Sequence, residues 1–379
     1  MNIRVFLRHI LDALKAQLNI KLTTLAIGLA IVPTSYAAEI SPYNEAGGFA
    51  NRPTVVTKHS PSKVVPLVYK NKDEMGFFES MKLGAADSIT KRESNLGLLV
   101  IKDGKVLHES YKSEYANENS LFFSMSMSKS LTAYSIAGLV CSGKVDINRP
   151  TGEYTDELRG TTWDTATVRD NLMMASGAKN PVFSGQIEKG QFGKATYHRA
   201  SNNEIMLRNG ERVREPGTRF NYLSVDTSAV ERVIAGATKK MNMLDEFNTQ
   251  VWDQVGAERD ARWNIDKAGA LNAYAGFSAT LRDWGRLGLW SLAKNKEDSC
   301  EGKFHKEANT QQIVNHRERQ GKAFKGYGYQ VWIRNDNEYW WVGHGGQRVG
   351  INTEKNAIIV AFSYREDYMG ALYNLMDSL

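Results

Sequence analysis

Two stretches of the chain consist of short, strand-like runs separated by turn residues. In the first, residues 96–101 and 106–111 flank Asp103–Gly104, a pair typical of tight hairpin turns. In the second, polar turns at 335–337 and 354–356 separate strand-like runs, which cover residues 327–334, 338–342, 348–352 and 357–364. The pattern predicts one early hairpin and one late meander.

Helical spacing of apolar residues fills much of the remaining chain. The helices that it predicts cover residues 73–89, with Asp73 as the cap, 126–143, 167–174, 227–237, 281–292 and 368–376. Four prolines between residues 39 and 67 favour an irregular arm instead. Together these elements predict an α+β fold, an α/β sandwich in which helices flank an antiparallel sheet and a mainly helical region is inserted at about 145–267.

The first 37 residues have the pattern of a secretion signal. Small residues at 35 and 37 follow an apolar run over 22–32, and four basic side chains precede that run, at Arg4, Arg8, Lys15 and Lys21. This order predicts a signal peptide over residues 1–37, export to the periplasm, and one domain over residues 38–379. A retained N-terminal anchor is the alternative, because the charged segment is long.

Composition and charge exclude several classes of partner. The chain is 42% hydrophobic and 10% aromatic, as expected of a globular domain. Residues 1–37 carry four basic and one acidic side chain, so their removal lowers the formal net charge from +6 to +3. That charge is too small to indicate nucleic acid, and no second apolar stretch of spanning length follows. We therefore expect neither nucleic acid nor a membrane as a partner once the signal is removed.

The two cysteines, Cys141 and Cys300, leave two interpretations open. They could pair in an oxidising compartment, or remain two buried thiols. They lack the spacing of a metal site, and no H-E-x-x-H motif occurs among the seven histidines. No metal and no cofactor are predicted.

The spacing Ser-x-x-Lys occurs five times, so the spacing alone indicates nothing. The copies are Ser60/Lys63, Ser88/Lys91, Ser126/Lys129, Ser176/Lys179 and Ser291/Lys294. Only Ser126 falls at the predicted start of a helix, where the helix dipole favours negative charge developing on Oγ. Lys129 lies one turn later on the same face, and a desolvated amine there could act as a base. Taken alone, Ser126 is better explained as an N-cap residue.

Two further motifs change that interpretation of Ser126. Tyr222 and Ser224 form a Tyr-x-Ser after a predicted turn, and His344–Gly345–Gly346 lies between two strand-like runs. With Ser-x-x-Lys, these motifs in this order resemble the serine β-lactamase and penicillin-binding-protein superfamily. The resemblance is to its class C β-lactamase-like esterases and amidases, which include 6-aminohexanoate-dimer hydrolases. It covers roughly residues 96–364.

This resemblance implies a β-lactamase/transpeptidase-like fold and a role for each matching residue. Ser126 would be the nucleophile, Lys129 its base and Tyr222 a second proton carrier. The backbone N–H groups of Ser126 and Gln347 would form the oxyanion hole. Taken alone, Tyr222 is better explained as a half-buried aromatic residue after a turn.

The substrate-binding positions match the family less well. Gly345 and Gly346 would let the backbone approach the substrate closely. Ser224 stands where lactamases and D,D-peptidases of this branch usually have asparagine, and His344 where they usually have lysine. A hydroxyl forms fewer hydrogen bonds than an amide, and a largely neutral imidazole holds a carboxylate less firmly than an ammonium. Both departures favour simple esters or linear amides over β-lactams.

The sequence thus predicts an exported serine hydrolase that acts on a small-molecule ester or linear amide. β-Lactamase or D,D-peptidase activity is one alternative, and a catalytically inactive envelope-binding module is another. A Ser-His-Asp hydrolase using His344 is a weaker rival, because the chain has no G-x-S-x-G elbow.

Overall fold

The computed structural model describes residues 53–71, 73, 75–179, 211–266, 268–317 and 323–379. The predicted signal peptide lies outside the described residues. No helix within the described ranges is long and apolar enough to cross a membrane.

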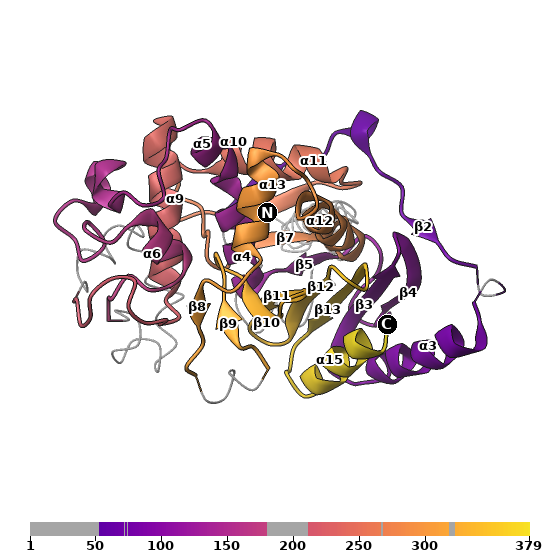
Figure 1. Cartoon of the computed structure of the whole chain (residues 1–379). Helices are drawn as coiled ribbons and strands as arrows, with labels where there is room; N and C mark the ends of the chain where they lie inside the picture. Colours follow the sequence, from indigo (N-terminus) through magenta and orange to yellow (C-terminus); the bar gives the residue numbers. More distant parts are fainter. Residues whose placement is uncertain (1–52, 72, 74, 180–210, 267, 318–322) are drawn as a thin grey trace, which may run out of the picture. The chain divides into compact units, whose positions relative to one another are not determined.

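A nine-stranded sheet joins the early hairpin to the late meander, as the strand pattern predicts (Figure 1). The hairpin is β3 (Asn95–Lys102) and β4 (Lys105–Tyr111), and the meander includes β11 (Glu338–Gly343), β12 (Gln347–Asn352) and β13 (Ala357–Ser363). β13 pairs antiparallel with β3, which brings residues some 260 positions apart side by side. The order is β2-β4-β3-β13-β12-β11-β10-β9-β8.

The edges of this sheet depart from the sequence prediction. β2 (Val68–Tyr69), for which no strand was predicted, follows the predicted irregular arm and pairs parallel with β4. The run predicted as one strand over 327–334 is instead two, β9 (Gly326–Tyr327) and β10 (Trp332–Asn335), beside β8 (Ile313–Val314). The cause is a tight turn, in which Gly328 N donates to Val331 O at 2.8 Å and Gln330 takes a left-handed φ of 60°.

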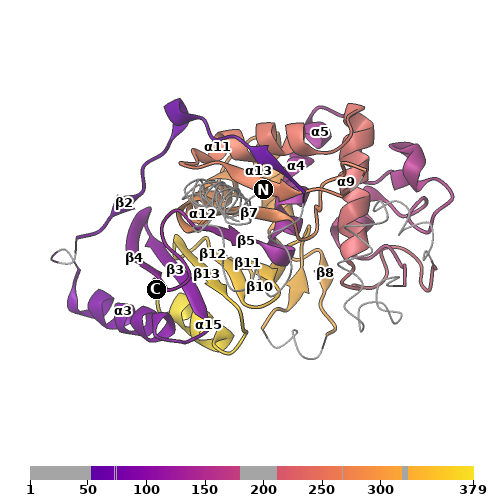
Figure 2. The same ribbon diagram turned by 180° about the vertical axis from the view of Figure 1, so that it is seen from behind.

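A second, four-stranded sheet has the order β1-β6-β7-β5. Two of its strands, β7 and β5, lie side by side in Figure 2. Its strands are β1 (Thr54–Thr57), β6 (Ala261–Asn264), β7 (Phe277–Thr280) and β5 (Leu121–Phe123). The sequence prediction missed this sheet, and it placed β1 in the irregular arm and β6 in the helical insertion. Strands of three or four residues are too short to show a period of two.

Alternating side chains of the large sheet build two cores. Leu98 and Val100 pack with α3 (Phe77–Thr90) and α15 (Met369–Ser378), while Leu99 and Ile101 face α12 (Leu281–Lys294). The helix predicted from Asp73 begins only at Phe77, after an N-cap at Gly76. On the other face, α12 lies close to β13, because a Cβ at Gly288 would stand 2.8 Å from Ile358.

The described part of the insertion is mainly helical and loop, as predicted apart from β6. Its helices and the neighbouring ones are α4 (Ser128–Ser135), α5 (Ala137–Cys141), α6 (Val168–Leu172), α9 (Ser224–Thr238), α10 (Leu244–Phe247), α11 (Asp253–Val255) and α13 (Cys300–Ala308). Short 3₁₀ turns cover Pro61–Lys63 (η1), Met125–Met127 (η3), Thr151–Glu153 (η4) and Asp156–Leu158 (η5), and a π-helix covers Asn248–Trp252 (η6).

A disulfide joins Cys141 at the end of α5 to Cys300 at the start of α13, with a Cα–Cα distance of 5.8 Å. Of the two possibilities that the sequence leaves open, the structure has the paired one.

Candidate active site

The second sheet leads directly into the predicted nucleophile. β5 ends at Phe123, and Ser124 N donates to Phe277 O of β7 at 2.7 Å. Met125 then takes a left-handed φ of 45°, a strained conformation for a residue other than glycine. Ser126 follows on the 3₁₀ turn η3, so the helix predicted to begin near Ser126 starts with this turn and becomes α4 at Ser128. The half-buried Ser126 side chain stands at the N-terminal end of α4.

The amine of Lys129 is buried beside Ser126. Its Nζ lies 3.1 Å from Ser126 Oγ and donates to the carbonyl oxygen of Tyr274 at 2.6 Å. The residue is 1% exposed, and no ion pair among the described residues involves it. Burial without a compensating carboxylate holds the pKa of Lys129 well below its usual range. Burial therefore favours the neutral form of the amine, which can accept a proton.

The hydroxyl of Tyr222 forms a second hydrogen bond to Ser126. Burial raises the pKa of Tyr222 to about 12, while that hydrogen bond and the charges of Arg317 and Arg348 act in the opposite direction. Lys129 Nζ lies 5.4 Å from the centroid of the Tyr222 ring. The phenol is therefore protonated at neutral pH, and the Ser126 hydroxyl lies between a potential acceptor and a potential donor.

The turn between β11 and β12 lies against the Ser126 turn. β11 ends at Gly343, where any Cβ would clash with the carbonyl oxygen of Ser124. Gly345 and Gly346 have left-handed φ values of 79° and 98°, so the turn needs glycine at both positions. Its conformation is fixed by buried Gln347, whose Nε2 donates to Ser363 O at 2.6 Å.

The structure therefore brings four of the predicted groups to one place: Ser126, Lys129, Tyr222 and the β11–β12 turn with Gln347. The oxyanion role of the Ser126 and Gln347 N–H groups stays a prediction. His344 is exposed on the turn, and Ser224 is half-buried as the first residue of α9. Their contacts with a substrate also stay predictions.

Three further residues contact the candidate site, although no motif in the sequence identifies them. The carbonyl of Tyr274, in the connection between β6 and β7, accepts the Lys129 bond. Arg348 is buried and donates from Nη1 to Gly343 O at 2.5 Å and Gln347 O at 2.9 Å, which braces the β11–β12 turn. Arg317 reaches the Tyr222 ring from the segment after β8. All three are brought to the site by tertiary contacts, which no spacing in the chain encodes.

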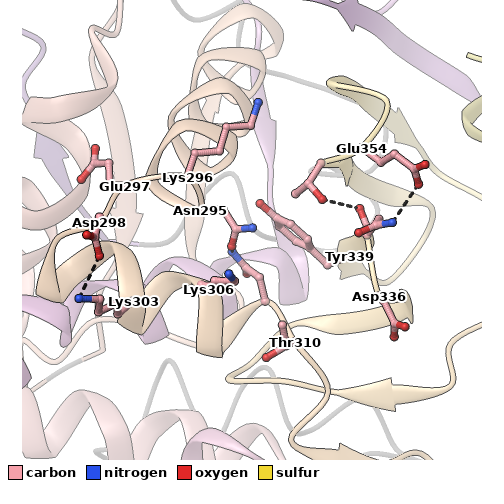
Figure 3. Close-up of a pocket in the computed structure, with 13 residues that line it drawn as sticks. Asn295, Lys296, Glu297, Asp298, Lys303, Lys306, Thr310, Asp336, Tyr339 and Glu354 are labelled. Atoms are coloured by element: carbon pink, nitrogen blue, oxygen red, sulfur yellow. Dashed lines mark hydrogen bonds and ion pairs between the residues drawn. The ribbon is translucent and has the colours of Figure 1, made fainter.

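Two hollows in the described part of the molecule differ in their relation to the candidate site. The smaller, of about 350 Å³, includes Tyr222 in its wall. The larger, of about 870 Å³ (Figure 3), lies near the start of β11. Gly343, at the other end of this strand, lies against the Ser126 turn. The larger hollow is lined by side chains such as Lys303, Asp298 and Tyr339, and none of the predicted catalytic residues reaches it. Of these two, the smaller hollow adjoins the candidate site.

A serine and a lysine one turn apart, with a tyrosine and a glycine-rich strand entry around them, define a class of acyl-transferring serine hydrolases. A family model described as beta-lactamase matches residues 84–373. The chain belongs to the beta-lactamase family, as its motifs indicate.

Similar proteins are consistent with that family. A 6-aminohexanoate-dimer hydrolase of Paenarthrobacter ureafaciens is 28% identical over 206 residues, covering 51% of this chain and 51% of that protein. The chain thus spans about half the length of this curated relative, and the relationship is distant.

Solved structures show the same fold. A provisionally named 6-aminohexanoate-dimer hydrolase from Bacillus anthracis has a TM-score of 0.71 at 20% identity, covering 88% of this chain and 92% of its own. A class C beta lactamase has a TM-score of 0.62 at 15% identity, covering 81% and 100%. The predicted β-lactamase/transpeptidase-like α+β fold is confirmed.

Proposed function

We propose that this chain is an exported serine hydrolase that cleaves a small ester or linear amide through an acyl-enzyme on Ser126. The observation that carries the proposal is the buried amine of Lys129, 3.1 Å from Ser126 Oγ. An uncharged lysine at this distance is a base for a serine hydroxyl, whereas a surface lysine would remain protonated.

Each proton in the reaction has a carrier. Lys129 takes the hydroxyl proton as Ser126 Oγ attacks the carbonyl carbon, and the resulting oxyanion accepts hydrogen bonds from the N–H groups of Ser126 and Gln347. Tyr222 gives its proton to the leaving oxygen or nitrogen and regains one from the Lys129 ammonium. A water molecule then attacks the acyl-enzyme and gives a proton to Lys129, from which Ser126 Oγ recovers it as the acid is released.

Two features support esters or linear amides over β-lactams. His344 and Ser224 replace the lysine and asparagine usual in lactamases of this branch, and His344 is exposed. The curated relative at 28% identity is named as a hydrolase of a 6-aminohexanoate dimer, not of a β-lactam. The alternative of an inactive envelope-binding module is disfavoured by the Lys129 and Tyr222 contacts with Ser126, which a binding protein has no need to keep.

Export is part of the same proposal. The charged, apolar and small-residue order of residues 1–37 supports a cleaved signal. The disulfide between Cys141 and Cys300 supports an oxidising compartment such as the periplasm, because such bonds form and persist there.

The substrate preference is tested by measuring kcat/KM for a short nitrophenyl ester and a chromogenic cephalosporin on one preparation. We expect the wild type to prefer the ester. The double variant His344→Lys with Ser224→Asn should shift the ratio toward the cephalosporin by about ten- to a hundredfold, since it restores a charged contact and an amide. A wild type that prefers the cephalosporin contradicts the proposed substrate class. An unchanged ratio in the variant shows that these two positions do not determine it.

A further inference from the structure

Gln330 lies in the turn between β9 and β10 of the large sheet, and it takes a left-handed φ of 60°. Glycine adopts this conformation without strain, whereas the Cβ of any other residue crowds the backbone there. A glutamine keeps such a conformation only where the surrounding structure holds it. The residue is 1% exposed, so its polar groups need partners within the protein.

Four polar groups of Gln330 are bonded to three different helices. Its backbone oxygen accepts from Ser130 Oγ on α4 at 2.7 Å, and its Oε1 accepts from Thr227 Oγ1 on α9 at 2.8 Å. Its Nε2 donates to Asn171 O at 2.8 Å, and its backbone N donates to Leu172 O at 2.9 Å. These two acceptors lie at the end of α6, where a helix has no further turn to bond its carbonyl groups. One side chain and its own backbone thus connect α4, α6 and α9.

The three helices carry the proposed catalytic groups or lead directly to them. Lys129 is on α4, and α9 begins two residues after Tyr222. Just beyond α6, the carbonyl oxygen of Met174 accepts a bond from Asn221 N, at 2.8 Å, immediately before Tyr222. α9 packs against both α4 and α6 (Figure 1). Gln330 is therefore bonded to the helix of the base and to the elements on both sides of the acid.

The base and the acid meet at one hydroxyl, although they come from distant parts of the chain. Lys129 Nζ lies 3.1 Å from Ser126 Oγ, and the Tyr222 hydroxyl bonds to the same group. Protons pass between such groups only at hydrogen-bond distance, so a small slide of α9 along α4 would separate them. Hydrogen bonds resist such a slide better than apolar contacts do, because they are directional.

We propose that Gln330 is a positioning residue, which holds Tyr222 in register with Ser126 and Lys129. The inference rests on the proposed function, in which Tyr222 gives its proton to the leaving atom. Gln330 acts through the helices and not by contact with the substrate. Its left-handed conformation lets the backbone oxygen face α4 while the side chain reaches α9. Loss of either bond should move the acid away from the nucleophile.

Two substitutions of the buried Thr227 separate the hydrogen bond from packing. Thr227→Val removes the hydroxyl and keeps the shape of the side chain, whereas Thr227→Ser keeps the hydroxyl and loses a methyl group. For a short alkyl ester we expect kcat/KM to fall by about tenfold or more in Thr227→Val and to stay near the wild-type value in Thr227→Ser. A role in packing predicts the opposite order.

Thr151→Val is the matched control. The Thr151 hydroxyl is also buried, and it donates to Trp163 O at 2.6 Å, a bond that involves none of the three helices. We expect this variant to hydrolyse the alkyl ester at the wild-type rate. Thermal melts establish that each variant is folded at the assay temperature.

A change of leaving group gives a readout that a loss of stability would not alter. The alkoxide of an alkyl ester needs a proton from Tyr222 as it leaves, whereas a nitrophenolate leaves without one. Thr227→Val should therefore lower kcat/KM for the alkyl ester at least about fivefold more than for the nitrophenyl ester of the same acid. Equal losses for the two esters, or no loss, overturn the inference and leave the hydrolase standing.

A second measurement separates this inference from the proposed function. If the wild type hydrolyses neither ester, the proposed substrate class fails, and the rate at which a fluorophosphonate labels Ser126 decides the inference. Because Tyr222 also orients the Ser126 hydroxyl, labelling should be at least about threefold slower in Thr227→Val and unchanged in Thr151→Val. Equal rates, or a wild type that is not labelled, overturn it. If Thr227→Val does not fold, Ser130→Ala removes the bond from α4 and is judged by the same criteria.

Discussion

Two serine–lysine pairs with identical spacing, on α4 and on α12, have opposite surroundings. Ser126 and Lys129 lie where α4 begins, and Lys129 is buried with no carboxylate partner among the described residues. Ser291 lies on α12 with its Oγ 3.0 Å from the hydroxyl of Tyr339, and Lys294 forms ion pairs with Glu297 at 3.0 Å and Glu301 at 3.7 Å. The second lysine has two carboxylate partners, while the first is desolvated.

The difference between these pairs arises from contacts far away in the sequence. Lys129 meets the carbonyl of Tyr274, which the β6–β7 connection supplies, and the hydroxyl of Ser126 meets Tyr222. The Lys294 partners lie three and seven residues further along the chain. Spacing brings a lysine within reach of a serine, but the tertiary environment decides whether that lysine is a base or a solvated cation.

Removal of each serine hydroxyl is the strongest test of this comparison. Ser126→Ala should lower kcat/KM for a short ester by about 10⁴-fold or more, because no other group can form the acyl-enzyme. Ser291→Ala should retain turnover within about tenfold and instead cost about 1–3 kcal/mol of stability, since the Tyr339 hydroxyl loses its partner. Steady-state kinetics and thermal melts of both variants measure this. Comparable activity losses in the two variants would end the assignment of Ser126.

Exchange of each lysine for methionine tests the contrast between the two amines. Lys129→Met should reduce kcat by about 10²–10⁴-fold, the range for loss of a general base. The melting temperature should not fall, because the substitution replaces a buried polar amine with an apolar side chain. Lys294→Met should leave kcat near that of the wild type.

The pH profile of the wild type gives a second measure of the same contrast. Because burial lowers the pKa of Lys129, its base form persists to lower pH than that of an exposed lysine, and activity should fall as pH drops through that lowered pKa. An activity that needs pH near 10 would mean that the amine is not desolvated.

The smallest expected effect concerns stability, and it arises at a third serine–lysine pair, Ser176 and Lys179. Ser176 Oγ donates to Asp226 Oδ1 at 2.7 Å, and burial raises the pKa of Asp226 to about 7. Between about pH 4 and pH 7 the folded chain holds a proton that the unfolded chain has released, so this group makes the fold less stable as pH rises. The melting temperature of Asp226→Asn relative to the wild type should therefore be higher at pH 7.5 than at pH 5, by a few degrees at most for a chain of this size. A difference that does not vary with pH would contradict the raised pKa.

Long periodic segments of this fold are predictable from the sequence, and short ones are not. The β3–β4 hairpin and the meander of β11 to β13 follow from strand-like runs of five to eight residues bounded by turn residues. β1 and β6 have four residues each, and no pattern of that length separates a strand from a loop. The turn at Gln330 divides one predicted strand in two. It could not be predicted, because nothing in the sequence marks a glutamine that takes a left-handed conformation.

Some residues of the candidate site could likewise be predicted from the sequence, and others could not. Ser126, Lys129 and Tyr222 follow from motifs, since the chemistry requires these residue types in a fixed order. Tyr274 contributes only a backbone carbonyl to Lys129, which any residue type could supply. Arg317 and Arg348 act through charge at positions that chain spacing does not link to Tyr222.

The disulfide determines what happens when the backbone is cut. A peptide bond cleaved anywhere between Cys141 and Cys300 leaves two fragments that remain covalently tethered, because the cysteines lie on opposite sides of the cut. Tyr222 lies inside this interval, whereas Ser126, Lys129 and Gln347 lie outside it. A nicked molecule therefore keeps every part of its candidate site attached to one covalent assembly. After a cut within this interval, a reductant is also needed to separate Tyr222 from either Ser126 and Lys129 or Gln347, depending on which side of Tyr222 the cut lies.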